Sequence, residues 1–103
     1  MRDEYIQAAR DALEAQGGLV TYTSGQVTAE FYAVIRPGVQ MFDEAGQALR
    51  VTALRAITDD MVNLKPGATF VDQETELRYE FLKTLENDGI TRQISVGRLS
   101  AEV

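Results

Sequence analysis

The sequence predicts a mainly β protein of the α+β class: a small antiparallel β-barrel or sandwich of about six strands, with an N-terminal helix and one short helical turn. Apolar residues recur at every second position in several stretches, which is the period of a half-buried strand. Clusters of Gly, Pro, Asn and Asp separate these stretches and supply turns. The beginning of the chain is instead rich in helix-forming residues, with apolar side chains at helical spacing.

Length and composition restrict the function classes. Residues 1–103 are enough for one small domain that buries a core without metal or disulfide staples. The 16 acidic and 10 basic residues give a formal net charge of −6, which opposes binding to phosphate backbones or anionic lipid. The chain has no His and no Cys, so it lacks the commonest general base, metal ligand and thiolate nucleophile. We therefore expect no enzyme, no catalytic residue, no cofactor and no metal site.

The sequence also bears on cellular location. No apolar run approaches the roughly 20 residues of a membrane span, and the first residues do not form a signal peptide. The absence of Cys is compatible with a reducing compartment. We expect a soluble protein made in the cytoplasm, with no membrane partner.

Residues 1–17 are predicted to form the N-terminal helix. Asp3 and Glu4 lie in its first turn, where the positive end of the helix dipole favours carboxylates. Gly17 and Gly18 are a natural stop. The apolar face is narrow and consists largely of Ala, so the helix either covers a sheet or packs fully only against a partner.

The strands follow from the alternation and from the turns between them. Pro37 and Gly38 are expected to end the second strand, because Pro cannot donate a hydrogen bond to a ladder. Asn87, Asp88 and Gly89 tolerate positive φ and favour a long final hairpin over a rival helical interpretation of the residues before them. The expected strands are residues 19–23, 27–35, 49–57, 68–71, 77–86 and 90–99.

Acidic residues between strands are the nearest approach to a catalytic or metal constellation. Thr58, Asp59 and Asp60 are predicted to cap the short helical turn, because their side chains accept from exposed backbone N–H groups. Adjacent Asp side chains do not converge on one ligand without further partners. The acidic cluster within residues 72–76 lacks the spacing of a calcium loop and is predicted to be a solvated turn.

Residues 37–48 lose the alternation and are predicted to form a long loop that is mobile alone and orders on binding. A plain surface excursion is the alternative. Met41 and Phe42 are an apolar pair within this polar stretch, and they need cover from the domain or from a partner. The candidate partner-binding residues are Val39, Met41, Phe42, Asp43 and Glu44.

Aromatic residues on the expected strands allow two interpretations. We expect Tyr79 and Phe81 to be core residues of the final hairpin. Alternatively, together with Phe31 and Tyr32, they are a platform on which bases stack in an oligonucleotide-binding barrel. That use needs a basic groove, whereas the basic residues here are scattered among more numerous acids.

The order of these parts resembles the head-tail joining (head completion or stopper) proteins of lambda-like long-tailed phages and prophages. The most specific piece is residues 58–70, in which an Asp-containing helical turn precedes Leu64, a Gly-centred turn and a strand. Tyr79 is placed like the aromatic residue that the family carries before an acidic, Gly-containing turn, here Asp88 and Gly89. The sequence departs from the family at one position: Gly67 of this turn is followed by Ala68, whereas family members often have Asp after the Gly.

The resemblance implies a structural virion protein at the head-tail junction, made in the bacterial host cytoplasm, without catalysis or cofactor. Its partners would be the head connector with its portal-side proteins, the tail-end proteins, and other copies in a ring of about six. DNA would pass through this ring without specific binding, because an acidic lumen repels phosphates. The alternative is a small protein- or peptide-binding β-domain of unrelated function that uses an exposed strand edge, followed by an oligonucleotide-binding barrel or an enzyme.

Overall fold

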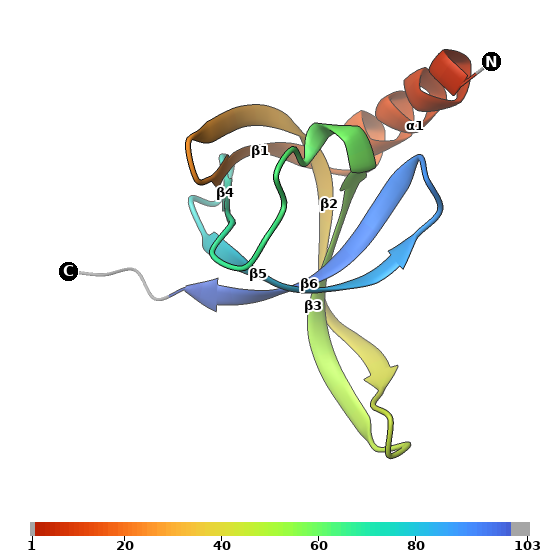
Figure 1. Cartoon of the computed structure of the whole chain (residues 1–103), viewed down its shortest axis with the longest axis vertical. Helices are drawn as coiled ribbons and strands as arrows, with labels where there is room; N and C mark the ends of the chain where they lie inside the picture. Colours follow the sequence, from red (N-terminus) through yellow and green to blue (C-terminus); the bar gives the residue numbers. More distant parts are fainter. Residues whose placement is uncertain (1, 100–103) are drawn as a thin grey trace.

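The computed structural model in Figure 1 describes residues 2–99. Residue 1 of the expected helical segment lies outside the described residues. The elements are, in chain order, helix α1 (Arg2–Gln16), strands β1 (Gly18–Ser24), β2 (Val27–Phe42) and β3 (Ala48–Ile57), the 3-10 helix η1 (Thr58–Asp60), and strands β4 (Thr69–Asp72), β5 (Arg78–Asn87) and β6 (Thr91–Leu99).

The six strands form one antiparallel sheet that closes on itself in the order β1-β2-β3-β6-β5-β4. Closure depends on the short strand β4, which pairs with β5 on one side and with β1 on the other. The mainly β fold with about six antiparallel strands is therefore confirmed, and of the two expected architectures the closed barrel is the one that forms.

An aromatic cluster fills the interior of the barrel. Tyr22 lies with its ring centroid 5.1 Å from that of Phe70 and 5.6 Å from that of Phe31. Its hydroxyl donates to the backbone carbonyl of Val62 at 2.7 Å, and burial raises the pKa of the Tyr22 phenol above its ordinary value. The largest fully buried side chains are Tyr22, Phe70, Leu54, Ile57, Ile94, Val20 and Ser24. A closed barrel of this size is thus a filled core and encloses no channel.

Helix α1 packs against the outside of the barrel, where it contacts β1, β2 and β3 (Figure 1). Leu13 is the buried residue of the helix, Ile6 and Ala9 are half-buried, and Tyr5 is exposed. The helix ends as the sequence predicts: the Gly17 N–H donates to the Leu13 carbonyl at 2.7 Å, and β1 begins at the next residue. The interpretation of α1 as a cover over the sheet is therefore confirmed, although the cover is partial.

The long final hairpin, β5 and β6, is confirmed, and its turn lies at the expected Asn-Asp-Gly sequence. The register shifts between Phe81 and Lys83, where Lys83 interrupts the apolar residues at every second position from Leu77 to Leu85. Leu82 lies at this bulge and is exposed, because the extra residue of a bulge leaves the regular alternation of faces. Tyr79 is buried, as expected, whereas Phe81 is only half-buried and packs at the margin of the core.

The prediction of a long loop at residues 37–48 is wrong. Strand β2 continues to Phe42, and β3 begins at Ala48, so this stretch belongs to an antiparallel hairpin closed by a short turn. Pro37 and Gly38 do not end the strand, because the register shifts between Arg36 and Val39 and the ladder skips both residues. Gly38 takes a φ of 70°, which suits a residue at such an irregularity. The mobility of this hairpin in the isolated protein stays a prediction.

Candidate functional site

The hairpin formed by residues 37–51, here called the arm, extends away from the barrel (Figure 1). Pairing between β1 and β2 ends at Ala33, and pairing between β3 and β6 begins at Thr52. Beyond these residues the two strands of the arm pair only with each other. The arm therefore has two open strand edges and two faces that another molecule could contact. Because a two-stranded ribbon is only marginally stable alone in water, such a contact would also stabilise the arm.

The two faces of the arm differ in polarity. Val39 pairs with Val51, and Met41 pairs with Leu49, so all four side chains lie on one face. The opposite face carries the pairs Gln40 with Arg50 and Phe42 with Ala48. Val39 and Met41, two of the predicted partner-binding residues, are therefore brought together, and Phe42 points the other way. Sequence analysis missed Leu49 and Val51, although the alternation of residues 49–57 was visible, because their pairing with residues 39–42 was not.

The tip of the arm is a tight acidic turn. The Asp43 carboxylate accepts the Gln47 N–H at 2.8 Å, and the Asp43 carbonyl accepts the Gly46 N–H at 2.9 Å. Asp43 therefore organises the turn, as Asp commonly does, instead of serving only a partner. Glu44 is exposed and takes no part in an ion pair among residues 2–99. Phe42 lies beside these carboxylates with 68% of its surface exposed.

A cleft of about 250 Å³ lies between α1 and the outer wall of the barrel, and is here called the α1 cleft. Small and aliphatic side chains line most of it, and Arg36 and Arg55 are the charged residues of the lining. The complete lining is Ala9, Ala12, Leu13, Gln16, Val34, Arg36, Ala53, Arg55, Thr91 and Gln93. The cleft exists because the α1 face that meets the sheet is built of Ala, which leaves space where a larger side chain would pack.

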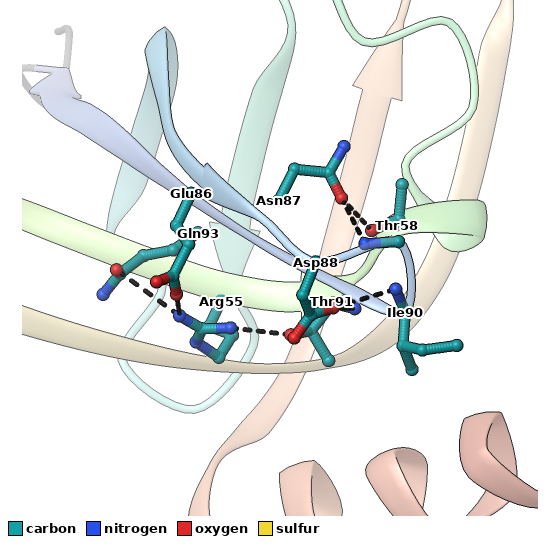
Figure 2. Close-up of polar contacts among 9 residues, drawn as sticks. Arg55, Thr58, Glu86, Asn87, Asp88, Ile90, Thr91 and Gln93 are labelled. Carbon is teal, nitrogen blue, oxygen red and sulfur yellow. Dashed lines mark hydrogen bonds and ion pairs between the residues drawn. The ribbon is translucent and has the colours of Figure 1, made fainter.

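Arg55 belongs to a polar network that joins β3 to the end of the final hairpin (Figure 2). Its guanidinium donates to the Thr91 hydroxyl at 2.6 Å and forms an ion pair with Glu86. A longer contact of 3.5 Å reaches the side-chain oxygen of Gln93. At the turn itself, the Thr58 hydroxyl contacts the side chain of Asn87 at 3.1 Å. The network orients Arg55, which lines the α1 cleft, and connects η1 to the hairpin.

The turn of the final hairpin is held by Asp88. Its Oδ1 accepts the backbone N–H groups of Ile90 at 2.9 Å and of Thr91 at 2.8 Å (Figure 2). These hydrogen bonds favour the ionised carboxylate and lower the pKa of Asp88 below its ordinary value. A lowered pKa means that the stabilisation is present above the ordinary pKa and is lost as the pH falls through the folded-state value.

We expect the Asp88 carboxyl to titrate in NMR with a midpoint below the usual value of about 3.9 for Asp. The amide resonances of Ile90 and Thr91 should move with the same midpoint, since both N–H groups donate to this carboxylate. In the Asp88→Asn variant this titration step should be absent from both amides. A midpoint at or above the usual value would contradict the role assigned to these hydrogen bonds.

The predicted capping role of Asp59 and Asp60 is wrong. The 3-10 helix η1 has no side-chain cap hydrogen bond, and both carboxylates instead face α1. Arg10 holds Asp60 through two hydrogen bonds of 2.6 and 2.8 Å, and Arg2 holds Asp59 through one of 3.0 Å. The capping prediction considered only neighbours along the chain. The guanidinium groups that pair with these carboxylates come from α1, about 50 residues earlier in the sequence.

We expect Asp60→Asn to lower the free energy of unfolding by about 1 kcal/mol, because a bidentate pair with a largely covered carboxylate is lost. Asp59→Asn is the matched control, since its ion pair with Arg2 is single and exposed and its loss should cost about 0.3 kcal/mol or less. Urea denaturation at low salt measures both, and high salt should reduce the difference. Equal costs for the two variants would contradict the assignment of Asp60 as the main ionic contact of α1.

Within residues 2–99 there is no group of three or more acidic side chains placed to hold a metal ion. Of the four aromatic residues considered for base stacking, Phe31 and Tyr79 are buried, Phe81 is half-buried and Tyr32 is exposed. No helix among these residues has the length and apolar character needed to cross a membrane. The fold and its surfaces define a small closed β-barrel with a projecting arm and a partly docked helix.

Comparison with known proteins adds no further assignment. The sequence matches no family model and no curated protein. The case for a function therefore depends on the geometry of the arm, the α1 cleft and the charge of the chain, together with the resemblance described above.

Proposed function

We propose that this protein is a structural virion component that joins the DNA-filled head of a long-tailed phage to its tail as a ring-forming adaptor without catalysis. The arm is the observation that carries the proposal. An exposed two-stranded ribbon with one apolar face is typical of a surface that contacts a neighbouring protein. The resemblance of residues 58–70 and of the final hairpin to the head-tail joining family names the setting in which such a contact would be made.

The charge of the chain supports the same setting. Copies that each carry −6 repel one another in solution, so we propose that the protein is monomeric or weakly associated when alone. A head connector with rotational symmetry would place each bound copy beside the next and raise the effective concentration at the contact between copies. Weak contacts would then close a ring of about six copies, and DNA would pass through it without being held.

The experiment combines purified protein with DNA-filled, tailless heads and then with tails. In sedimentation the protein alone should remain small at micromolar concentration, and it should move with the heads when they are added. Addition of tails should then yield joined particles. A stable large ring in the protein-only sample would contradict assembly on a template, and binding to naked DNA but not to heads would overturn the head-tail proposal.

Shortening the arm tests which part of the protein makes the contact. We expect a variant in which Asn-Gly replaces residues 40–50 to stay folded, because Val39 and Val51 are directly paired and a two-residue turn can join them. Its free energy of unfolding should stay within about 1 kcal/mol of the original, while its yield of joined particles falls about tenfold or more. The matched control is Gln26→Ala in the β1–β2 turn, which should lose neither. A folded variant with full joining activity would show that the arm is not used.

An unrelated peptide-binding domain is the second candidate, and the open edges of the arm favour it. Beyond Ala33 strand β2 pairs with no strand on its outer side within the described residues, so an extended peptide could add along the arm as a further strand. Selection from a library of displayed peptides separates the two candidates. Tight binding of a peptide at this edge together with failure to bind heads would favour the second.

A further inference from the structure

We propose that the arm tip of one copy docks into the α1 cleft of the next copy, with Phe42 in the cleft and Glu44 beside Arg36. The inference rests on the proposed function, because it assigns the contact between neighbouring copies in the proposed ring. It makes the occupant of the cleft a second copy of this chain.

The arm tip has the composition of a small docking element. Phe42, the last residue of β2, is 68% exposed. Its aromatic side chain therefore has a large apolar surface that docking would remove from water. The turn residues Asp43 and Glu44 follow it directly, so the ring is flanked by negative charge. The turn is held by hydrogen bonds from Gln47 and Gly46, so little order has to be gained on docking.

The α1 cleft has the complementary composition. Its volume of about 250 Å³ is larger than the cavity of about 150 Å³ that is sufficient to bind benzene in an engineered protein core, so a phenyl ring fits. Ala9, Ala12 and Leu13 from α1 provide one apolar wall, and Val34 and Ala53 from the barrel provide the other.

The two charged residues that line the cleft, Arg36 and Arg55, are both basic, opposite to the acidic tip. Arg36 directly precedes the arm in the chain and takes no part in an ion pair within residues 2–99. The charge of Arg55 is already paired with Glu86, so Arg36 is the cation that Glu44 would meet. Glu44 likewise has no ion-pair partner among these residues. Local attraction of this kind can offset part of the general repulsion between acidic copies.

The contact has to be made between copies. The arm points away from α1, toward the opposite end of the molecule, so a tip cannot enter the cleft of its own chain (Figure 1). Tip and cleft are different surfaces, and a contact between different surfaces is head-to-tail, which generates a ring if the rotation closes. A contact made by one phenyl side chain and a few charges buries far less surface than the roughly 1,200 Å² of a stable interface. The contact between copies would therefore need a template to persist.

An arm-to-arm contact is the main rival. It would cover the face that carries Val39 and Met41, but it would leave the α1 cleft empty. The acidic tip would find only Arg50 on the other arm, and that guanidinium already donates to the Gly38 carbonyl at 2.9 Å. The cleft provides the apolar space and also Arg36, which has no ion-pair partner within residues 2–99, so we favour docking of the tip into the cleft.

The absence of Cys from the chain permits a direct test by site-specific cross-linking. Ala45→Cys places a thiol on the arm tip without altering its charges, and Ala12→Cys places one on the wall of the cleft. The two purified variants are mixed at high concentration with a short thiol-specific cross-linker. We expect covalent dimers at about ten times the yield of a mixture of Gln26→Cys with Ala12→Cys, since the proposed contact does not place the β1–β2 turn of one copy in the cleft of another.

Other patterns of cross-linking would contradict the tip-to-cleft contact. Cross-linking of Ala45→Cys with itself at the same yield would establish the arm-to-arm contact and overturn the inference, as would equal yields for the tip and control mixtures. In the tip mixture, Arg36→Glu on the cleft partner should reduce the yield about tenfold, and Glu44→Arg on the tip partner should restore it. Failure of this restoration would overturn the charge pairing.

Failure of this inference is distinguishable from failure of the proposed function. If the chain joins heads to tails but gives no tip-to-cleft cross-link, alone or on heads, the proposed function stands and the contact is elsewhere. If the cross-link forms between free copies but the chain does not bind heads, the contact stands and the head-tail proposal falls.

Discussion

Replacing Phe70 by alanine is expected to lower the free energy of unfolding by about 3 to 5 kcal/mol. Phe70 has no exposed surface, and it lies on β4 between Tyr22 of β1 and Tyr79 of β5, with which it is directly paired. Alanine at this position would remove the ring that contacts Tyr22 and leave a cavity in the middle of the barrel. Since β4 is also the strand that closes the sheet, the surroundings have little freedom to collapse into the space.

A cost of this size is a large part of the roughly 5 to 15 kcal/mol that stabilises a small domain. Urea denaturation measures it, and other phenylalanines of the same chain provide controls. Phe81→Ala, at a half-buried site, should cost roughly half as much, and Phe42→Ala, on the exposed arm tip, should cost less than about 0.5 kcal/mol. If Phe70→Ala cost no more than Phe42→Ala, the filled barrel interior would be wrong.

Replacing Gly17 by alanine is expected to cost about 3 kcal/mol and to release α1 from the barrel. A Cβ on Gly17 would lie 2.1 Å from the Ala33 carbonyl oxygen and 2.7 Å from its carbon, and both are backbone atoms that cannot rotate away. The chain can relieve this overlap only by separating the end of α1 from β2. Leu13 would then lose its cover, and the ion pair between Arg10 and Asp60 would be broken.

The neighbouring glycine is a matched control. A Cβ added to Gly18 meets no atom within 4 Å, so Gly18→Ala should change the free energy of unfolding by about 0.5 kcal/mol or less. Denaturation measures both variants, and amide hydrogen exchange should show loss of protection in α1 for Gly17→Ala while β4 to β6 stay protected. The same small cost for both variants would show that α1 does not approach β2 this closely. Because α1 forms one wall of the α1 cleft, Gly17→Ala should also abolish the tip-to-cleft cross-link.

Local signals in the sequence predicted most of the strands. Alternation located β1, β3 and β6, and the Asn-Asp-Gly turn located the final hairpin, because both depend only on residues close together in the chain. The prediction failed where residues such as Pro37 and Gly38 usually end a strand. Only pairing with β3 keeps β2 going past them, and that pairing is a contact across the chain that no local signal contains.

The candidate site divides in the same way. The sequence by itself determined that residues 39–44 carry unexplained apolar and acidic side chains, and that the chain has a net charge of −6 and contains neither His nor Cys. Only the tertiary structure decided that Val39 and Met41 share a face with Leu49 and Val51, that Asp60 contacts Arg10, and that α1 leaves a cleft against the barrel. The physical reason is that composition and periodicity are properties of neighbouring residues, whereas register, ion pairs and clefts arise when distant segments meet as the sheet closes.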